Sequence, residues 1–222
     1  MRLRDFQPSI PHQSHESQDW WCLNSISEHY FSGWWPAKVL TAETVKLVVE
    51  LSDGTEKFRQ KEEYQQLINV ARVQTHFDFD SYCTANVLDK KKMLLTAMHD
   101  GCLRACEIKG WDETPFQVAK DKVIAENYDY WVFGKLHSRA DRKFKTQLIM
   151  HYGWDKTEFI AVLFDKNGKE LERQTIHQMK PSGLLSDQLL GKFGWLDLQT
   201  AYLQARNGNQ VCEVIFASLH PA

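Results

Sequence analysis

Three side chains that could bind a soft metal ion, His99, Cys102 and Cys106, follow one another at positions i, i+3 and i+7. On a helix this spacing places one imidazole and two thiols along one face, where they could contribute to a zinc site. A structural zinc site usually takes four ligands, often from paired Cys-x2-Cys motifs, and the sequence holds no second pair. The alternative is that the two thiols fill a helix core beside an ordinary histidine, and the sequence favours it.

A second candidate lies in the segment His76-Phe77-Asp78-Phe79-Asp80, where polar and aromatic residues alternate. On a strand, the imidazole and both carboxylates would share one face, and such ligands suit Mg²⁺ or Mn²⁺. A metal-dependent hydrolase using His76, Asp78 and Asp80 is therefore one functional hypothesis. The alternative is an acidic linker whose two phenylalanines anchor a domain junction.

Other catalytic signals are weak. The dipeptide His99-Asp100 resembles the His-Asp dipeptide of metal-dependent phosphohydrolases. The sequence offers no matched set of the further His and Asp ligands that those enzymes need. Cys83 with a distant histidine could form a nucleophilic pair, although five cysteines and nine histidines offer such pairs by chance. The sequence contains no Gly-x-Ser-x-Gly, phosphate-loop or dinucleotide motif. We therefore expect a non-catalytic protein, with no catalytic residues and no cofactor.

Composition limits the classes of partner. The net charge of -2 lacks the basic excess typical of proteins that bind nucleic acid. No apolar run is long enough to cross a membrane, and the start of the chain lacks the apolar core of a secretory signal. Scattered cysteines suit a reducing compartment. These features predict a cytoplasmic protein that binds neither nucleic acid nor membrane.

A basic turn is expected at 138–143, with Arg139 and Arg142 at its centre. One interpretation is an ordinary solvated loop. The other is a protruding tip that steers an acidic partner.

The elements that would carry these residues fall into two blocks, which follow an N-terminal leader. Prolines break the polar stretch 1–18, which we expect to be a flexible leader. Within 19–73, the sequence predicts a small β-barrel, and 74–222 reads as an α+β domain. The predicted barrel strands are 20–26, 34–41, 45–51 and 55–59, followed by a turn or helix at 61–67.

The first block carries a family resemblance. Trp34-Trp35-Pro36-Ala37-Lys38-Val39 followed by a Val-rich run ending at Asp53-Gly54 resembles Tudor-like SH3-type barrels. The resemblance implies a cage of aromatic residues that holds a methylated Lys or Arg by cation–π attraction. Trp35 matches one cage position, but Glu50 and Asp53 fall where further rings are expected. The resemblance therefore implies a reader, a protein that binds a peptide or a methylated ligand, with an incomplete aromatic cage.

The second block begins with helical periodicity. Apolar spacing predicts a helix over 90–109 that ends at Gly110, and Thr114-Pro115 starts a second helix that ends near Asn127. Four strands then follow, and Asn167-Gly168 predicts a type I′ hairpin turn. We expect the two helices to pack on one face of this antiparallel meander. The predicted strands are 130–136, 145–152, 158–164 and 169–176, then a loop at 177–194, an undecided element at 195–206 and a strand at 210–218.

This block resembles some immunity proteins of bacterial polymorphic-toxin systems, on scattered apolar positions over 90–176 and on Gly110-Trp111-Asp112. The resemblance implies a non-catalytic inhibitor that occludes the active site of a cognate toxin. Interfaces draw most of their energy from a few aromatic and arginine anchors. The residues predicted to contact the protein partner are Trp34, Trp35, Trp111, Trp154, Arg139 and Arg142.

Overall fold

The computed structural model describes residues 1–9, 23–34, 37, 39–53, 64–181 and 189–219. The chain divides into two compact units, Met1–Tyr128 and Asp129–Ala222. The predicted division after residue 73 falls inside strand β4 (Val70–His76), within the first unit.

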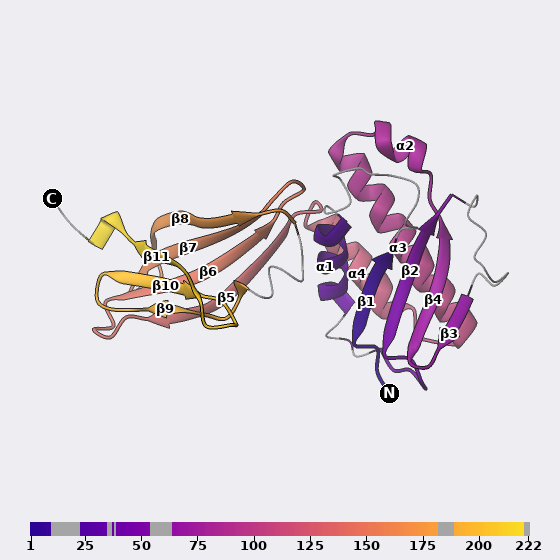
Figure 1. Cartoon of the computed structure of the whole chain (residues 1–222), viewed down its shortest axis with the longest axis horizontal. Helices are drawn as coiled ribbons and strands as arrows, with labels where there is room; N and C mark the ends of the chain where they lie inside the picture. The colour runs from indigo at the N-terminus through magenta and orange to yellow at the C-terminus, as the bar shows by residue number, and fades with distance from the viewer. Residues whose placement is uncertain (10–22, 35–36, 38, 54–63, 182–188, 220–222) are drawn as a thin grey trace. The chain divides into compact units, whose positions relative to one another are not determined.

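The first unit is a mixed sheet with helices packed on one face (Figure 1). The sheet order is β1-β2-β4-β3, in which β1, β2 and β4 run parallel and β3 is antiparallel to β4. Besides β4, its elements are β1 (Asp5–Ser9), α1 (Leu23–Trp34), β2 (Lys46–Ser52), β3 (Tyr64–Leu67), α2 (Phe79–Thr84), α3 (Val87–Lys109) and α4 (Thr114–Ala125).

Close approaches hold the helices against the sheet and against each other. A Cβ atom at Gly101 of α3 would lie only 2.5 Å from Cγ1 of Val49 on β2, so this position admits no side chain without a shift. A Cβ at Gly33 of α1 would lie 2.7 Å from Cα of Ala119 on α4. Both glycines therefore allow backbones to pack closer than larger residues permit.

The predicted Tudor-like barrel is wrong. A helix, α1, occupies most of the region where a strand, a loop and a second strand were expected, and the described residues form an open, largely parallel sheet and no closed barrel. The strand predicted at 45–51 is confirmed as β2, whereas β3 replaces the turn or helix expected at 61–67. The strand predicted at 55–59 lies outside the described residues.

The prediction of a flexible leader at 1–18 is also wrong for the first half of that range. Residues Asp5–Ser9 form β1, which pairs in parallel with β2, and Leu3 is 1% exposed. Proline is compatible with this position because β1 lies at the edge of the sheet, where Pro8 need not donate a ladder hydrogen bond. The remainder of the leader, from residue 10 on, lies outside the described residues.

Both predicted helices of the second block are confirmed as α3 and α4. Gly110 adopts the left-handed conformation (φ 65°) that ends α3, as predicted. The N-cap of α4 is Glu113 rather than Thr114, and the Asp112 carboxylate accepts a hydrogen bond from the Thr114 backbone N–H.

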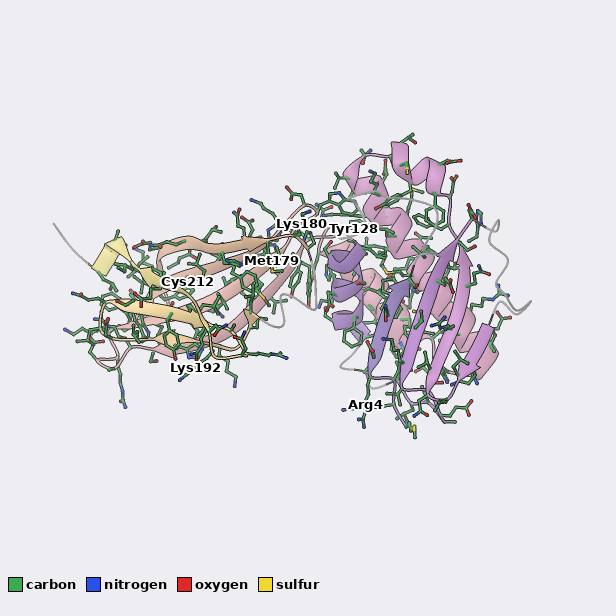
Figure 2. The ribbon with its side chains drawn as sticks, viewed as in Figure 1. Arg4, Tyr128, Met179, Lys180, Lys192 and Cys212 are labelled. Carbon is green, nitrogen blue, oxygen red and sulfur yellow. The ribbon has the colours of Figure 1, made fainter. Side chains whose placement is uncertain are left out.

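The second unit consists of two antiparallel sheets that pack together. The four predicted strands form the meander β5-β6-β7-β8, and the second sheet has the order β11-β10-β9. Met179 and Cys212, labelled in Figure 2, pack beside the core between these sheets. The strands are β5 (Tyr130–Ser138), β6 (Phe144–Tyr152), β7 (Thr157–Asp165), β8 (Glu170–Met179), β9 (Lys192–Trp195), β10 (Thr200–Gln204) and β11 (Gln210–Ile215), followed by the short helix η3 (Ala217–Leu219).

The packing partners of the helices and of the meander differ from the prediction. Helix α3 packs on β2 and β4, and α1 packs on α4, all within the first unit. The core face of the meander packs instead on the three-stranded sheet, through residues such as Phe159, Leu163 and Phe216. The hairpin at Asn167-Gly168 is confirmed, but only Gly168 has positive φ, so the turn is not type I′.

Side-chain hydrogen bonds connect the meander to the three-stranded sheet along one border and to the short helix after that sheet along the other. The Glu172 carboxylate of β8 accepts from the backbone N–H groups of Ala217 and Ser218, at 3.1 and 2.8 Å. On the other border, the Trp195 indole N–H of β9 donates to the carbonyl of His137 on β5 over 3.0 Å. These bonds hold the meander against the three-stranded sheet and against η3.

Candidate functional site

The predicted tryptophan anchors occupy different environments. Trp34 is 0% exposed and packs against Phe31 and Phe116, so its proposed contact with a partner is wrong. Trp35 lies outside the described residues. Trp111 and Trp154 are half-buried, which leaves their proposed role in binding open.

Arg139 serves the structure of the second unit. Its guanidinium forms two hydrogen bonds with Asp141, at 2.9 and 2.6 Å, and donates to the Leu198 carbonyl at 2.6 Å. It also lies 4.3 Å from the centroid of the Phe144 ring, and its side chain is only 10% exposed. Arg142, in contrast, is exposed in a left-handed turn conformation. Of the two predicted basic anchors, the structure therefore leaves only Arg142 with an accessible side chain.

We expect Arg139→Lys to lower the free energy of unfolding, because lysine cannot form the two-pronged contact with Asp141. Urea denaturation of the whole chain measures the loss. Arg142→Lys is the matched control and should change stability by no more than about 0.5 kcal/mol. Equal losses in the two variants would show that the internal contacts of Arg139 contribute little.

The same pair predicts an acid-sensitive contribution. The hydrogen bond from Arg139 lowers the pKa of Asp141 to about 2. Because the folded-state pKa lies below the ordinary value of 3.8, the contribution is present above that value and is lost as the pH falls toward 2. Stability measured between pH 5 and about pH 2 should therefore fall more steeply for the native chain than for Asp141→Asn. Parallel curves would contradict this assignment.

The three candidate zinc ligands lie in the core of the first unit. His99, Cys102 and Cys106 are 1%, 0% and 4% exposed. The His99 Nδ1 atom shares a hydrogen bond with the Tyr30 hydroxyl at 3.0 Å, and burial raises the pKa of the Cys106 thiol to about 12. Because all three side chains are buried in the packed interior, the alternative interpretation as helix-core residues is confirmed.

His76, Asp78 and Asp80 do not come together as a metal site. His76 ends β4, and both carboxylate oxygens of Asp78 accept hydrogen bonds from Ser81 at the start of α2. Over the described ranges, no group of three or more His, Cys, Asp or Glu side chains is placed to hold a metal ion. His76 and Asp78 do, however, border a hollow of about 300 Å³ together with Asp100 of α3.

A feature that the sequence reasoning missed is a second apolar surface on the meander. One face packs on the three-stranded sheet, and the opposite face carries an inner group of Ile149, Ile160 and Val162. Register places Phe133 beside Ile149 and Leu136 beside Gln147, and cross-strand neighbours share a face. We call the following set the outer apolar patch: Trp131, Phe133, Leu136, Ile149, Ile160, Val162 and Phe164.

The outer apolar patch is most accessible along β5, the edge strand of the meander. Phe133 is 64% exposed and Leu136 is 54% exposed, on either side of an irregularity in the β5–β6 register. Ile149, Ile160 and Val162 are at most 6% exposed and are packed against Trp131 and Phe164. The patch thus combines a well-packed base with protruding apolar side chains at an edge.

One end of the patch carries a fixed polar group. The Trp131 ring stacks on His151 at 4.0 Å, and its N–H donates to Asp129 over 2.7 Å. The two ring nitrogens of His151 lie 2.6 Å from Asp129 and 3.4 Å from Glu158. These contacts orient Trp131 before any partner binds, which limits the entropy that binding costs.

Comparison of the chain with protein-family models, with curated proteins and with solved structures gives no match. No helix in the described part of the chain is long and apolar enough to cross a membrane.

Proposed function

We propose that the chain is a non-catalytic binding protein that docks a protein partner on the outer apolar patch of its second unit. The observation that carries this proposal is the pair of protruding side chains, Phe133 and Leu136, on an edge strand beside a packed apolar base. Exposed apolar side chains that adjoin further apolar residues, rather than standing singly, are typical of protein interaction sites.

The strand sequences support the same proposal. In β7 the residues from Phe159 to Leu163 are all apolar and at most 6% exposed, so apolar side chains alternate onto both faces. A sheet with one solvated face usually shows polar residues at every second position. The second apolar face is therefore more than a two-sheet sandwich needs for its own core.

The patch also has the anatomy of an energetic anchor. Aromatic residues contribute a large share of binding energy when they enter a pocket on the partner. Phe133 can do so because it protrudes, whereas Trp131 provides a preoriented surface next to it. The side chains of Lys145 and Arg173 lie on the same face by register and could form a polar rim.

For the partner, we propose a cognate toxin whose active site is occluded on binding. The sequence resemblance to immunity proteins supports this class, and the order of two helices followed by a four-stranded meander agrees with it, with the helices in the first unit and the meander in the second. The reader alternative has lost its basis because no Tudor-like barrel forms among the described residues. The alternative of a metal-dependent hydrolase is not supported, because His76, Asp78 and Asp80 do not form a group that could hold a metal ion.

The test is co-expression with the product of the adjacent gene. We expect a complex that survives gel filtration, and we expect cells that express the neighbouring product to grow only when this chain is present. If no complex forms and growth is not protected, the toxin-inhibitor proposal fails. If a complex forms without protection, protein binding stands and neutralisation does not.

A further inference from the structure

Two motifs that are far apart in the sequence meet at one hollow in the first unit. The hollow, of about 300 Å³, lies where β4 ends, between the start of α2 and one face of α3. Residues His76 and Asp78 come from the strand end, and Lys92, Thr96 and Asp100 recur every four residues along α3. The volume is at the lower end of the range typical of small-molecule sites.

The position within the fold is one where ligands commonly bind. Strands β2 and β4 run parallel, so their carboxyl ends meet at the same edge of the sheet. Ligands of open sheets with parallel strands usually bind just beyond this edge. The edge is firmly built here, because the Phe77 N–H donates to the Ser52 carbonyl at 2.7 Å and the Phe77 side chain is 3% exposed.

The charges of the lining favour a cation. Asp78 and Asp100 bring carboxylates from two different elements, and hydrogen bonds from Ser81 lower the pKa of Asp78, which keeps it ionised. The one ammonium group of the lining, on Lys92, lies 3.1 Å from Asp89 and is partly neutralised by it. An anion would therefore meet two carboxylates and a cation already paired.

The remaining lining is apolar. The apolar part of the lining consists of Phe77, Met93 and Ala97, of which Ala97 is 5% exposed. A bare inorganic cation would gain nothing from such a surface, and no three-ligand metal group occurs in the described part of the chain. A cation carried on an alkyl chain would use both parts of the lining.

We propose that this hollow binds an alkylammonium or alkylguanidinium group, with the charged head at Asp78 and Asp100 and the alkyl chain against Met93 and Ala97. Such a group is presented either by a free small amine or by a Lys or Arg side chain of a peptide. This site belongs to the first unit and does not depend on the partner proposed for the outer apolar patch.

The experiment is a titration of the isotope-labelled whole chain followed by the methyl resonance of Met93. n-Butylamine is the probe, and n-butanol at the same concentration and ionic strength is its uncharged match. We expect saturable shifts with the amine and none with the alcohol. Asp100→Asn should weaken amine binding about fivefold, the scale of an exposed ion pair.

Asp80→Asn is the matched control, because Asp80 is exposed on α2 and lies outside the lining of the hollow. It removes the same charge and should leave amine binding unchanged. A blocked Ala-Lys-Ala peptide distinguishes the two sources: tighter binding than butylamine assigns a basic side chain, and weaker binding assigns a free amine. Equal shifts with amine and alcohol, or equal binding by the Asp100→Asn and native chains, would overturn the proposal.

Discussion

Replacing Trp34 with alanine is expected to lower the free energy of unfolding by about 3–5 kcal/mol, the range for truncating a large buried aromatic side chain. Trp34 is 0% exposed and is surrounded by rings from three elements. Phe6 of β1 lies 6.3 Å away, Phe31 of α1 4.9 Å and Phe116 of α4 5.2 Å, between ring centroids. The cavity would therefore loosen the contacts of β1, α1 and α4 at the same time.

Urea denaturation measures this loss, and amide hydrogen exchange should show faster opening of α1 and α4. Trp111→Ala is the matched control: Trp111 is half-buried after the end of α3, and its truncation should cost only about 1–2 kcal/mol. Trp34→Phe adds a second comparison, because the Trp34 indole N–H is buried without a hydrogen-bond partner among the described residues. Phenylalanine removes that unpaired donor and should cost far less than alanine. Equal losses for Trp34→Ala and Trp111→Ala would contradict the assignment of Trp34 to the core.

The failure to predict α1 has a physical explanation. Four side chains that are buried in α1, Leu23, Ile26, Tyr30 and Trp34, follow a helical spacing of three and four residues. The aromatic pair before Pro36 resembles a barrel strand, and this local pattern favoured a strand over a helix. Proline two residues after the last helical residue is equally a sign that a helix has ended.

Local signals predicted the later elements well. Gly110 and Pro115 mark helix ends through backbone conformation alone, so the bounds of α3 and α4 could be read from the sequence to within a few residues. The surface on which those helices pack could not be read in this way. It depends on contacts of α3 with β2 and β4, strands that precede it, rather than with the strands that follow.

The candidate sites were predictable in part. The motif His76-Phe77-Asp78 and the dipeptide His99-Asp100 were both recognised, but their meeting at one hollow depends on how β4 and α3 pack. The outer apolar patch had a usable signal in the uninterrupted apolar run from Phe159 to Phe164. Such a run is typical of a strand with both faces covered. Only the register shows that Phe133 and Leu136 extend this second face to the edge of the sheet.

Phe133→Asp is expected to weaken binding of the cognate partner at least about 30-fold, as for loss of an interface hot spot worth about 2 kcal/mol. The substitution places a carboxylate where we propose that an aromatic side chain enters an apolar pocket. Because Phe133 is 64% exposed, the folded chain should tolerate the change. Calorimetric titration against the product of the adjacent gene gives the affinity, and thermal unfolding checks the fold.

Two variants make the result specific to the outer apolar patch. Val118→Asp introduces the same charge at a residue of α4 that is 56% exposed, and it should leave binding unchanged. Phe133→Tyr keeps the ring and should retain most of the affinity, which shows that the loss in Phe133→Asp comes from removal of the aromatic contact. If Phe133→Asp and Val118→Asp bind equally well, the partner docks elsewhere, because an edge aromatic anchor cannot be replaced by a carboxylate without loss of its apolar contact.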